Sequence, residues 1–366
     1  MLTNPRHRAP FLLLGFLALA LGVTAGLGLL GWPWFAQAAS SLLVQHGALM
    51  ICGFFGTLIS LERAVALGRL WVYAGPALAG AGTLLLLTDL PIAGAAGFYL
   101  GASLVLSAAS WQVYRQHPAL FTATLALGAS CWSLGTLIWL LGGAPMQIRL
   151  WWLSFLILTI AGERLELSRF LAPPPRVQRQ FAALLVLLLA SLAASIRWPE
   201  AGSWVFGMLL ILLSLWLARY DIAKRTVRMA GLTRFIAICL LSAYGWLALA
   251  GVLIVVDGGL QPGGFYFDAA LHAITLGFVF GMVFGHAPII LPSVLKVNLA
   301  YRPRFYLHFA LLQISLLVRV AGDLAASPEW RGWGGALNAL AIGLFLLNSL
   351  TAVLRGRSAP SSFRAR

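Results

Sequence analysis

Charged side chains are scarce in this chain, and acidic ones are the scarcest. Of 366 residues only 10% are charged and just ten are Asp or Glu, whereas 61% are hydrophobic. A composition this poor in charge lies outside the range of soluble globular domains. Apolar runs of about twenty residues recur along the chain, and this is the length that a helix needs to cross a bilayer. The composition therefore predicts an all-α, polytopic membrane bundle in which residues 1–366 form a single integral domain in the lipid bilayer.

Cysteine is almost absent. The three cysteines, Cys52, Cys131 and Cys239, each lie inside an apolar run. The chain has no Cys-x-x-Cys-His motif, which excludes covalent attachment of a c-type haem, and no Cys-x-x-Cys pair of the kind that binds zinc. We interpret all three cysteines as small buried hydrophobic residues.

The apolar runs predict about twelve transmembrane helices. Their connections are short, so no soluble domain fits between them. In chain order the expected spans are about 10–31, 39–61, 70–88, 91–113, 119–141, 148–167, 179–196, 202–219, 232–256, 267–293, 303–324 and 333–354.

The net charge of +15 taken alone is typical of a nucleic-acid-binding protein. The positions of the basic residues relative to the expected spans favour another explanation. With the N-terminus inside, all but four of the 25 Lys and Arg residues fall in cytoplasmic segments or at their edges. The exceptions are Arg149, Arg197 and Arg331 on the opposite side and Arg319 within a span. An excess of positive charge marks cytoplasmic loops. The asymmetry predicts an N-in, C-in topology and argues against a nucleic-acid partner.

The start of the chain also has features of a secretory signal peptide. Arg6 and Arg8 precede an apolar stretch, and the segment Ala36-Gln37-Ala38 that follows is typical of a cleavage site. The apolar stretch is about twenty residues long, which exceeds the usual length of a signal-peptide core. We therefore expect it to remain in the protein as the first span.

Six histidines are present, and four of them fall within spans. His46 on the second span and His272 on the tenth lie in the outer third of the membrane. His286 lies near the inner end of the tenth span, and His308 lies in the inner third of the eleventh. An imidazole in lipid is costly unless it meets a partner inside the bundle. The two remaining histidines fall in loops, where we expect them to be solvated: His7 and His117.

The four span histidines therefore form an outer pair and an inner pair. Two opposed neutral imidazoles at one depth are what a six-coordinate haem iron requires, and they would equally suit copper. We predict that His46 and His272 bind one haem near the outer face, and that His286 and His308 are candidate ligands of copper or a second haem. The alternative for each is a hydrogen bond to a neighbouring helix.

Other residues near these histidines favour particular roles. Gly47 leaves room for a flat macrocycle beside His46. Arg319 points to the outer level, where we expect an ion pair with Asp323 one turn away; a haem propionate is the alternative partner. Small residues repeat every four positions on the tenth span, which favours close helix packing: Gly277, Gly281 and Gly285.

The segment His46-Gly47-Ala48-Leu49-Met50-Ile51 resembles the second-helix motif of haem–copper oxidase subunit I, whose histidine binds the low-spin haem. That subunit also has twelve spans, and its other low-spin ligand lies on helix ten, where this chain has His272. The resemblance implies an oxidase-subunit-like bundle. Oxidases also build their oxygen site from histidines on helices six and seven, and the corresponding spans here have none. We therefore expect the oxygen-reducing copper–haem site to be absent.

The chain is also similar to the NnrS family, twelve-span membrane proteins that contain haem and copper and are linked to nitric oxide metabolism. Three short motifs carry the similarity: His272-Ala273-Ile274-Thr275-Leu276-Gly277, Ala161-Gly162-Glu163-Arg164 and Leu317-Val318-Arg319-Val320. The segment 285–292, which contains His286, departs from that family's pattern. The similarity implies a haem protein of a bacterial-type inner (plasma) membrane.

These inferences predict a b-type haem held by His46 and His272. Its role would be electron transfer, with a redox partner protein, or binding of a small gas such as nitric oxide in nitrosative stress. One alternative is a transporter or channel without cofactor, in which the span histidines form a proton relay. Another is a structural assembly partner in which the histidines only connect helices.

Overall fold

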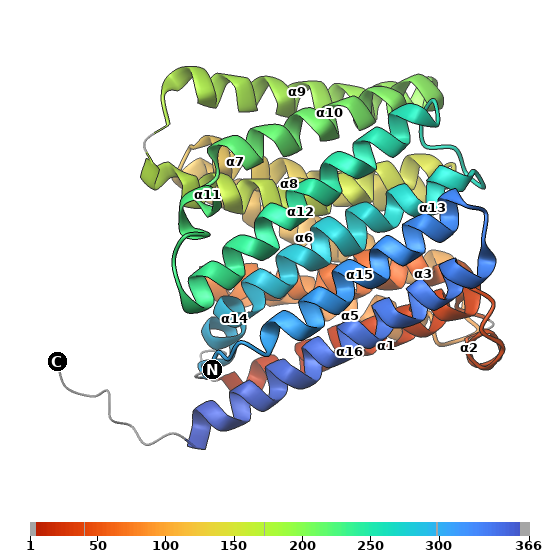
Figure 1. Cartoon of the computed structure of the whole chain (residues 1–366), viewed down its shortest axis with the longest axis horizontal. Helices are drawn as coiled ribbons and strands as arrows, with labels where there is room; N and C mark the ends of the chain where they lie inside the picture. Colours follow the sequence, from red (N-terminus) through yellow and green to blue (C-terminus); the bar gives the residue numbers. More distant parts are fainter. Residues whose placement is uncertain (1–4, 40, 172, 298, 359–366) are drawn as a thin grey trace.

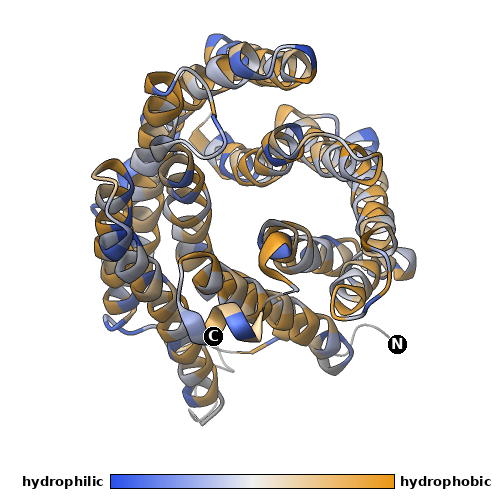
Figure 2. Ribbon diagram, turned by 90° about the vertical axis from the view of Figure 1, so that its right-hand side faces the viewer, coloured by the Kyte–Doolittle hydropathy of each residue, from blue (hydrophilic) through white to orange (hydrophobic). Residues whose placement is uncertain are grey.

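The protein is a bundle of long helices that run side by side in one general direction (Figure 1). The computed structural model describes residues 5–39, 41–171, 173–297 and 299–358, and these contain no strand. Seen along their axes, the helices form curved rows (Figure 2). The principal helices are α1 (Ala9–Leu29), α4 (Gly56–Leu67), α5 (Ala74–Leu85), α6 (Ile92–Gln116), α7 (Leu120–Leu140), α8 (Pro145–Ser168), α9 (Pro175–Arg197), α10 (Pro199–Tyr220), α12 (Gly231–Val256), α14 (Gly281–Leu295), α15 (Phe305–Leu324) and α16 (Pro328–Ser358).

Within the described ranges, eleven helices are long and apolar enough to cross a membrane. They correspond in order to the predicted spans, with one exception. The span expected at 70–88 is a shorter apolar helix, Leu70–Leu85. At about 1.5 Å per residue it extends about 24 Å, short of the roughly 30 Å of a hydrocarbon core. The all-helical architecture predicted from composition is confirmed, and the long apolar helices fit a multi-pass membrane protein.

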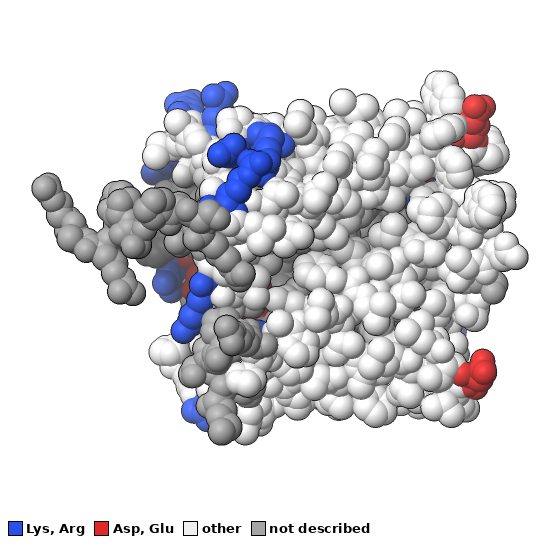
Figure 3. Space-filling model, turned by 90° about the horizontal axis from the view of Figure 1, so that it is seen from below, with Lys and Arg blue, Asp and Glu red and all other residues white. Residues whose placement is uncertain are grey.

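Charge separates the two ends of the bundle. Exposed Lys and Arg gather at the end where both termini lie, and the most prominent acidic side chains on this face are at the opposite end (Figures 1 and 3). We refer to these as the basic end and the acidic end. Arg364 and Arg366 of the C-terminal tail, also assigned to the cytoplasmic side, lie outside the described residues. The distribution agrees with the loop asymmetry found in the sequence.

Small residues allow close contact between the helices of the core. The stripe of Gly277, Gly281 and Gly285 faces α12, as expected for helix packing: a Cβ at Gly285 would lie 3.1 Å from the Cβ of Cys239, and one at Gly277 would overlap the indole of Trp246.

Two further predictions about single residues are confirmed. The three cysteines are buried and their thiols are free. His7 and His117 are exposed.

The contact between α10 and α12 generates a stability prediction. A Cβ at Gly251 would lie 2.5 Å from the carbonyl oxygen of Gly207, so Gly251→Ala forces the two backbones apart. We expect the substitution to reduce the free energy of unfolding by about 1–3 kcal/mol, the usual cost of overpacking. The measurement is the thermal unfolding midpoint in detergent. Gly245→Ala on the same helix is the control, because a Cβ there meets nothing within 4 Å. Equal midpoints for the two variants would contradict the close approach.

Candidate histidine site

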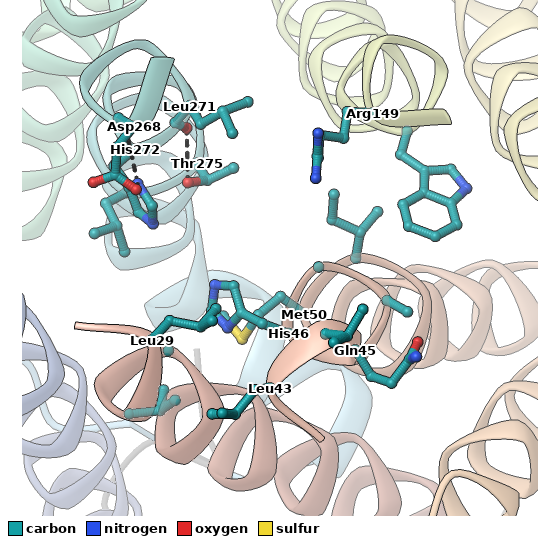
Figure 4. A pocket seen from close by; sticks show the side chains of 18 of the residues that line it. Leu29, Leu43, Gln45, His46, Met50, Arg149, Asp268, Leu271, His272 and Thr275 are labelled. Atoms are coloured by element: carbon teal, nitrogen blue, oxygen red, sulfur yellow. Dashed lines mark hydrogen bonds and ion pairs between the residues drawn. The ribbon is translucent and has the colours of Figure 1, made fainter. Parts of the chain in front are cut away.

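His46 and His272 face each other near the acidic end of the bundle (Figure 4). His46 begins the short helix α3 (His46–Ala48), and His272 ends helix α13 (Phe265–His272). Their ring centroids are 6.5 Å apart and their planes differ by 25°. The structure therefore brings together the two histidines that the sequence placed at one depth.

The hydrogen bonds of His46 fix its tautomer. Its Nδ1 lies 2.8 Å from the carbonyl oxygen of Gly22 on α1. A carbonyl only accepts, so the proton is on Nδ1 and the lone pair is on Nε2. An imidazole held in this way is ready to bind a metal through Nε2.

His272 has the same tautomer, set by a different partner. Its Nδ1 lies 2.9 Å from the backbone oxygen of Asp268 and 3.2 Å from the side-chain Oδ1 of the same residue. Both atoms are acceptors, so Nδ1 again carries the proton. Hydrogen bonding to a carboxylate orients a ligating imidazole and raises its basicity. In the neutral form of each ring, the lone pair is therefore on Nε2.

The backbone changes helical type shortly after each histidine, after Ala48 in one case and directly after His272 in the other. The segment Leu49–Phe55 follows α3, the segment Ala273–Phe280 follows His272, and both are π-helical. A π segment inserts an extra residue per turn and re-aims side chains, and such segments are frequent at functional sites. Hydrophobic periodicity gave no signal for either, because a π turn barely alters an all-apolar run.

Glycines make room around His46. A Cβ at Gly26 would lie 2.9 Å from Cε1 of His46, so the ring packs directly on the α1 backbone. At Gly47 a Cβ would meet nothing within 4 Å, and this residue lines a cavity. The space beside His46 that the sequence predicted is therefore present.

That cavity, which we call the outer cavity, has a volume of about 830 Å³. His46 and His272 line it together with Gly47, and the apolar remainder of its wall includes Phe55 and Phe280. Pockets for cofactors and small ligands usually have volumes of about 300–1,000 Å³ and carry only a few polar groups. The outer cavity fits a large, flat and mainly apolar molecule.

Arg319 does not make the ion pair expected from the sequence. Its guanidinium is bound bidentately by Asp268, with Nε 3.1 Å from Oδ2 and Nη2 2.9 Å from Oδ2. Asp323 instead lies 3.9 Å from Nε of Arg331. The prediction of an Arg319–Asp323 pair was wrong because sequence spacing reveals partners on one helix but not across helices. Arg319, Asp268 and His272 form one connected chain of polar contacts.

Arg149 is a site residue that the sequence analysis did not identify. It projects from α8 into the outer cavity, across from His272 (Figure 4). Its guanidinium carbon lies 5.2 Å from the ring centroid of Phe267, and no carboxylate among the described residues pairs with it. The sequence placed Arg149 on the side that became the acidic end of the bundle. It did not show that the Arg149 side chain points into the cavity. This side chain gives the cavity a positive charge suited to an anionic group.

His286 and His308 have separate environments. Nε2 of His286 lies 2.8 Å from Nη1 of Arg164 and its Nδ1 lies 2.7 Å from the Met282 carbonyl oxygen, so both ring nitrogens have partners. His308 is buried, with rings such as Phe284 around it. No ring contact or hydrogen bond joins the two histidines in the described segments. Depth alone placed them together, and depth does not specify position around the bundle.

A metal site made by protein ligands alone is not evident. Across the residues that the structure describes, no group of three or more His, Cys, Asp or Glu side chains could hold a metal ion. Two opposed imidazoles are sufficient where a macrocycle supplies the other four nitrogens, as in haem. The chemistry of the donor set therefore fits haem better than an isolated ion.

Fold and site together define a multi-pass helical membrane protein with an intramembrane histidine pair beside a large apolar cavity. Residues 8–354 match a family described as a domain of unknown function, DUF8744. Because the match covers nearly the whole chain, the protein belongs to this family. No curated protein matches the chain.

The polar chain behind His272 can be tested by its effect on stability. Asp268→Asn removes the charge that holds Arg319, whose side chain is 9% exposed. We expect a loss of about 2 kcal/mol in the free energy of unfolding, the typical value of a charged hydrogen bond. Asp89→Asn, on an exposed loop, is the control. The readout is the unfolding midpoint in detergent, and equal midpoints would show that the pair contributes nothing to stability.

Proposed function

We propose that the protein binds a b-type haem between His46 and His272. The opposed imidazoles carry the proposal. Two metal–nitrogen bonds of about 2 Å each, plus about 1.2 Å from each nitrogen to its ring centroid, separate the two centroids by about 6.4 Å. The observed 6.5 Å matches this separation.

The surrounding residues have complementary roles in this proposal. The Gly22 carbonyl and Asp268 accept hydrogen bonds from the two Nδ1 atoms, which leaves both Nε2 atoms available to bind the iron. Gly47 leaves the face of the cavity open. Arg149 offers a cation to the carboxylate substituents that every b-type haem carries.

The activity that we propose is electron transfer. A haem with two histidine ligands carries one electron at a time and binds a gas only when one ligand leaves. His46 and His272 therefore favour electron transfer, and nitric oxide binding would require displacement of one imidazole. The apolar part of the outer cavity wall would lower the dielectric around the bound group and so influence its redox potential.

We also propose the membrane context. The basic end faces the cytoplasm of a bacterial-type inner membrane, with both termini inside, because positive charge marks that side. The helix Leu70–Leu85 is then the shortest of twelve spans. The resemblance to NnrS proteins and to haem–copper oxidase subunit I supports this arrangement, with His46 and His272 on the second and tenth spans. His286 and His308 are not included as metal ligands.

The visible spectrum of the purified protein, oxidised and then reduced, tests the haem. We expect a Soret band and sharp bands on reduction. His46→Ala and His272→Ala would each remove one histidine that holds the haem, so each variant should bind haem at least about tenfold more weakly, which corresponds to about 1.4 kcal/mol.

His117→Ala is the matched control and should keep the full spectrum. A colourless wild-type preparation from haem-sufficient cells would contradict the proposal and favour a transporter without cofactor. A spectrum that survives both cavity substitutions would place the haem elsewhere.

Arg149 provides an independent test of the orientation of the bound group. Arg149→Ala removes the unpaired cation from the outer cavity, so haem dissociation should accelerate roughly tenfold, corresponding to about 1.4 kcal/mol. The measurement is transfer of haem to an excess of apomyoglobin. Arg197→Ala, on the same side of the bundle but outside the cavity, is the control. Equal transfer rates would exclude contact between Arg149 and the cofactor.

A further inference from the structure

A second cavity lies nearer the basic end. It has a volume of about 520 Å³, and we call it the inner cavity. Its wall is formed mainly by apolar side chains of α1, α4, α8, α14 and α16. Two carboxylates interrupt this apolar surface: Glu62 of α4 and Glu163 of α8. In the sequence, both glutamates precede an arginine at the inner end of a span, a pattern that an ordinary interfacial ion pair would also explain.

The two carboxylates lack partners in the cavity. Glu62 and Glu163 are close enough to interact electrostatically, and neither has a hydrogen bond or ion pair within the described residues. His286 also lines the cavity, but both its ring nitrogens are occupied. The Thr159 hydroxyl donates to the Phe155 carbonyl. Carboxylates in an apolar membrane interior are costly unless donors or protons reach them.

A third polar group in this cavity is also unsatisfied. Ser349 of α16 is 5% exposed, and its Oγ is buried without a hydrogen-bond partner in the described part of the chain. Buried hydroxyls nearly always have a partner. Two partly exposed carboxylates without a hydrogen bond or ion pair among the described residues, and one buried hydroxyl without a partner, therefore line one apolar space on three different helices. This combination is typical of a site for an apolar ligand with a few polar groups.

The inner cavity adjoins the histidine site. Phe55, Phe280 and Ile342 line both cavities, so a single layer of side chains separates them. The rings of Phe55 and Phe280 are in edge contact, with centroids 5.4 Å apart. A ligand in the inner cavity would therefore lie next to the proposed haem.

We propose that the inner cavity binds a lipid-soluble hydroquinone. Its ring would occupy the apolar space, and its two hydroxyl groups would donate to Glu62 and Glu163. Ser349 would donate its hydroxyl proton to a ring oxygen. This class of molecule reaches a cavity from the bilayer and carries two O–H donors on an apolar ring, which matches the two unpartnered carboxylates.

The redox role of the site rests on the proposed function, whereas binding does not. Oxidation of one hydroquinone to the quinone releases two protons and two electrons. Glu62 and Glu163 would accept the two protons. A haem held by His46 and His272 would supply a one-electron acceptor, so two molecules of the protein would together take up the two electrons. No further oxidant is needed for this balance.

The test uses full-length protein in detergent and a decyl-substituted benzohydroquinone under anaerobic conditions. Binding is followed by quenching of tryptophan fluorescence and by the shift in thermal unfolding midpoint. We expect the Glu62→Gln, Glu163→Gln double variant to bind at least tenfold more weakly. Glu166→Gln, one turn beyond Glu163 and outside the cavity wall, is the matched control and should bind as wild type. Val283→Phe, which fills the cavity without touching the carboxylates, should also abolish binding.

Equal affinity for wild type and the double variant, or for wild type and Val283→Phe, would overturn the site. Equal binding of decanol at the same residues would contradict hydroquinone as the ligand and favour an acyl chain. Equal binding of tetraphenylphosphonium there would favour a lipophilic cation. The His46→Ala, His272→Ala double variant should still bind hydroquinone, so absence of haem and absence of this site are distinguishable. Wild-type haem that dithionite reduces but the hydroquinone does not would overturn the redox role.

Discussion

The site depends on one constraint: two imidazoles must lie opposite each other inside an apolar bundle, each with its Nδ1 held by a hydrogen bond. Each ring achieves this by giving its Nδ1 proton to an oxygen that cannot return one, at Gly22 for His46 and at Asp268 for His272. A buried polar group without such a partner is expensive. The close packing of α1 on His46, the π segments and the bound Arg319 all serve to keep these two hydrogen bonds in place.

The pairing of the two histidines was predictable from the sequence, because membrane spans give each residue an approximate depth in the bilayer. Apolar length and basic loops place each residue at a depth, and depth alone paired His46 with His272. The same reasoning failed to distinguish His286 and His308, which share a depth but occupy different surroundings. Asp268 was detectable in principle, four residues before His272. The hydrogen bond between Asp268 and Arg319 was not detectable. It joins two helices, and the sequence does not show which faces of two helices meet.

The helices pack closely in one part of the molecule and leave cavities in another. Where α10 meets α12, glycines bring backbones together and leave no space. Beside the π segments, by contrast, two cavities are present, and they share the side chains of Phe55 and Phe280. These two residues are the last of the segments Leu49–Phe55 and Ala273–Phe280. The ends of the two π segments thus form an aromatic layer between the two cavities.

The two histidines are held by unequal partners. His46 gives its proton to a neutral peptide carbonyl, whereas His272 shares its proton with a carbonyl and a carboxylate that Arg319 partly neutralises. A carboxylate strengthens the donor character of the opposite nitrogen more than a carbonyl does. In the proposed haem site, His272 would therefore be the firmer ligand. His46 would be the more labile one, on the side of the cavity where Gly47 leaves open space.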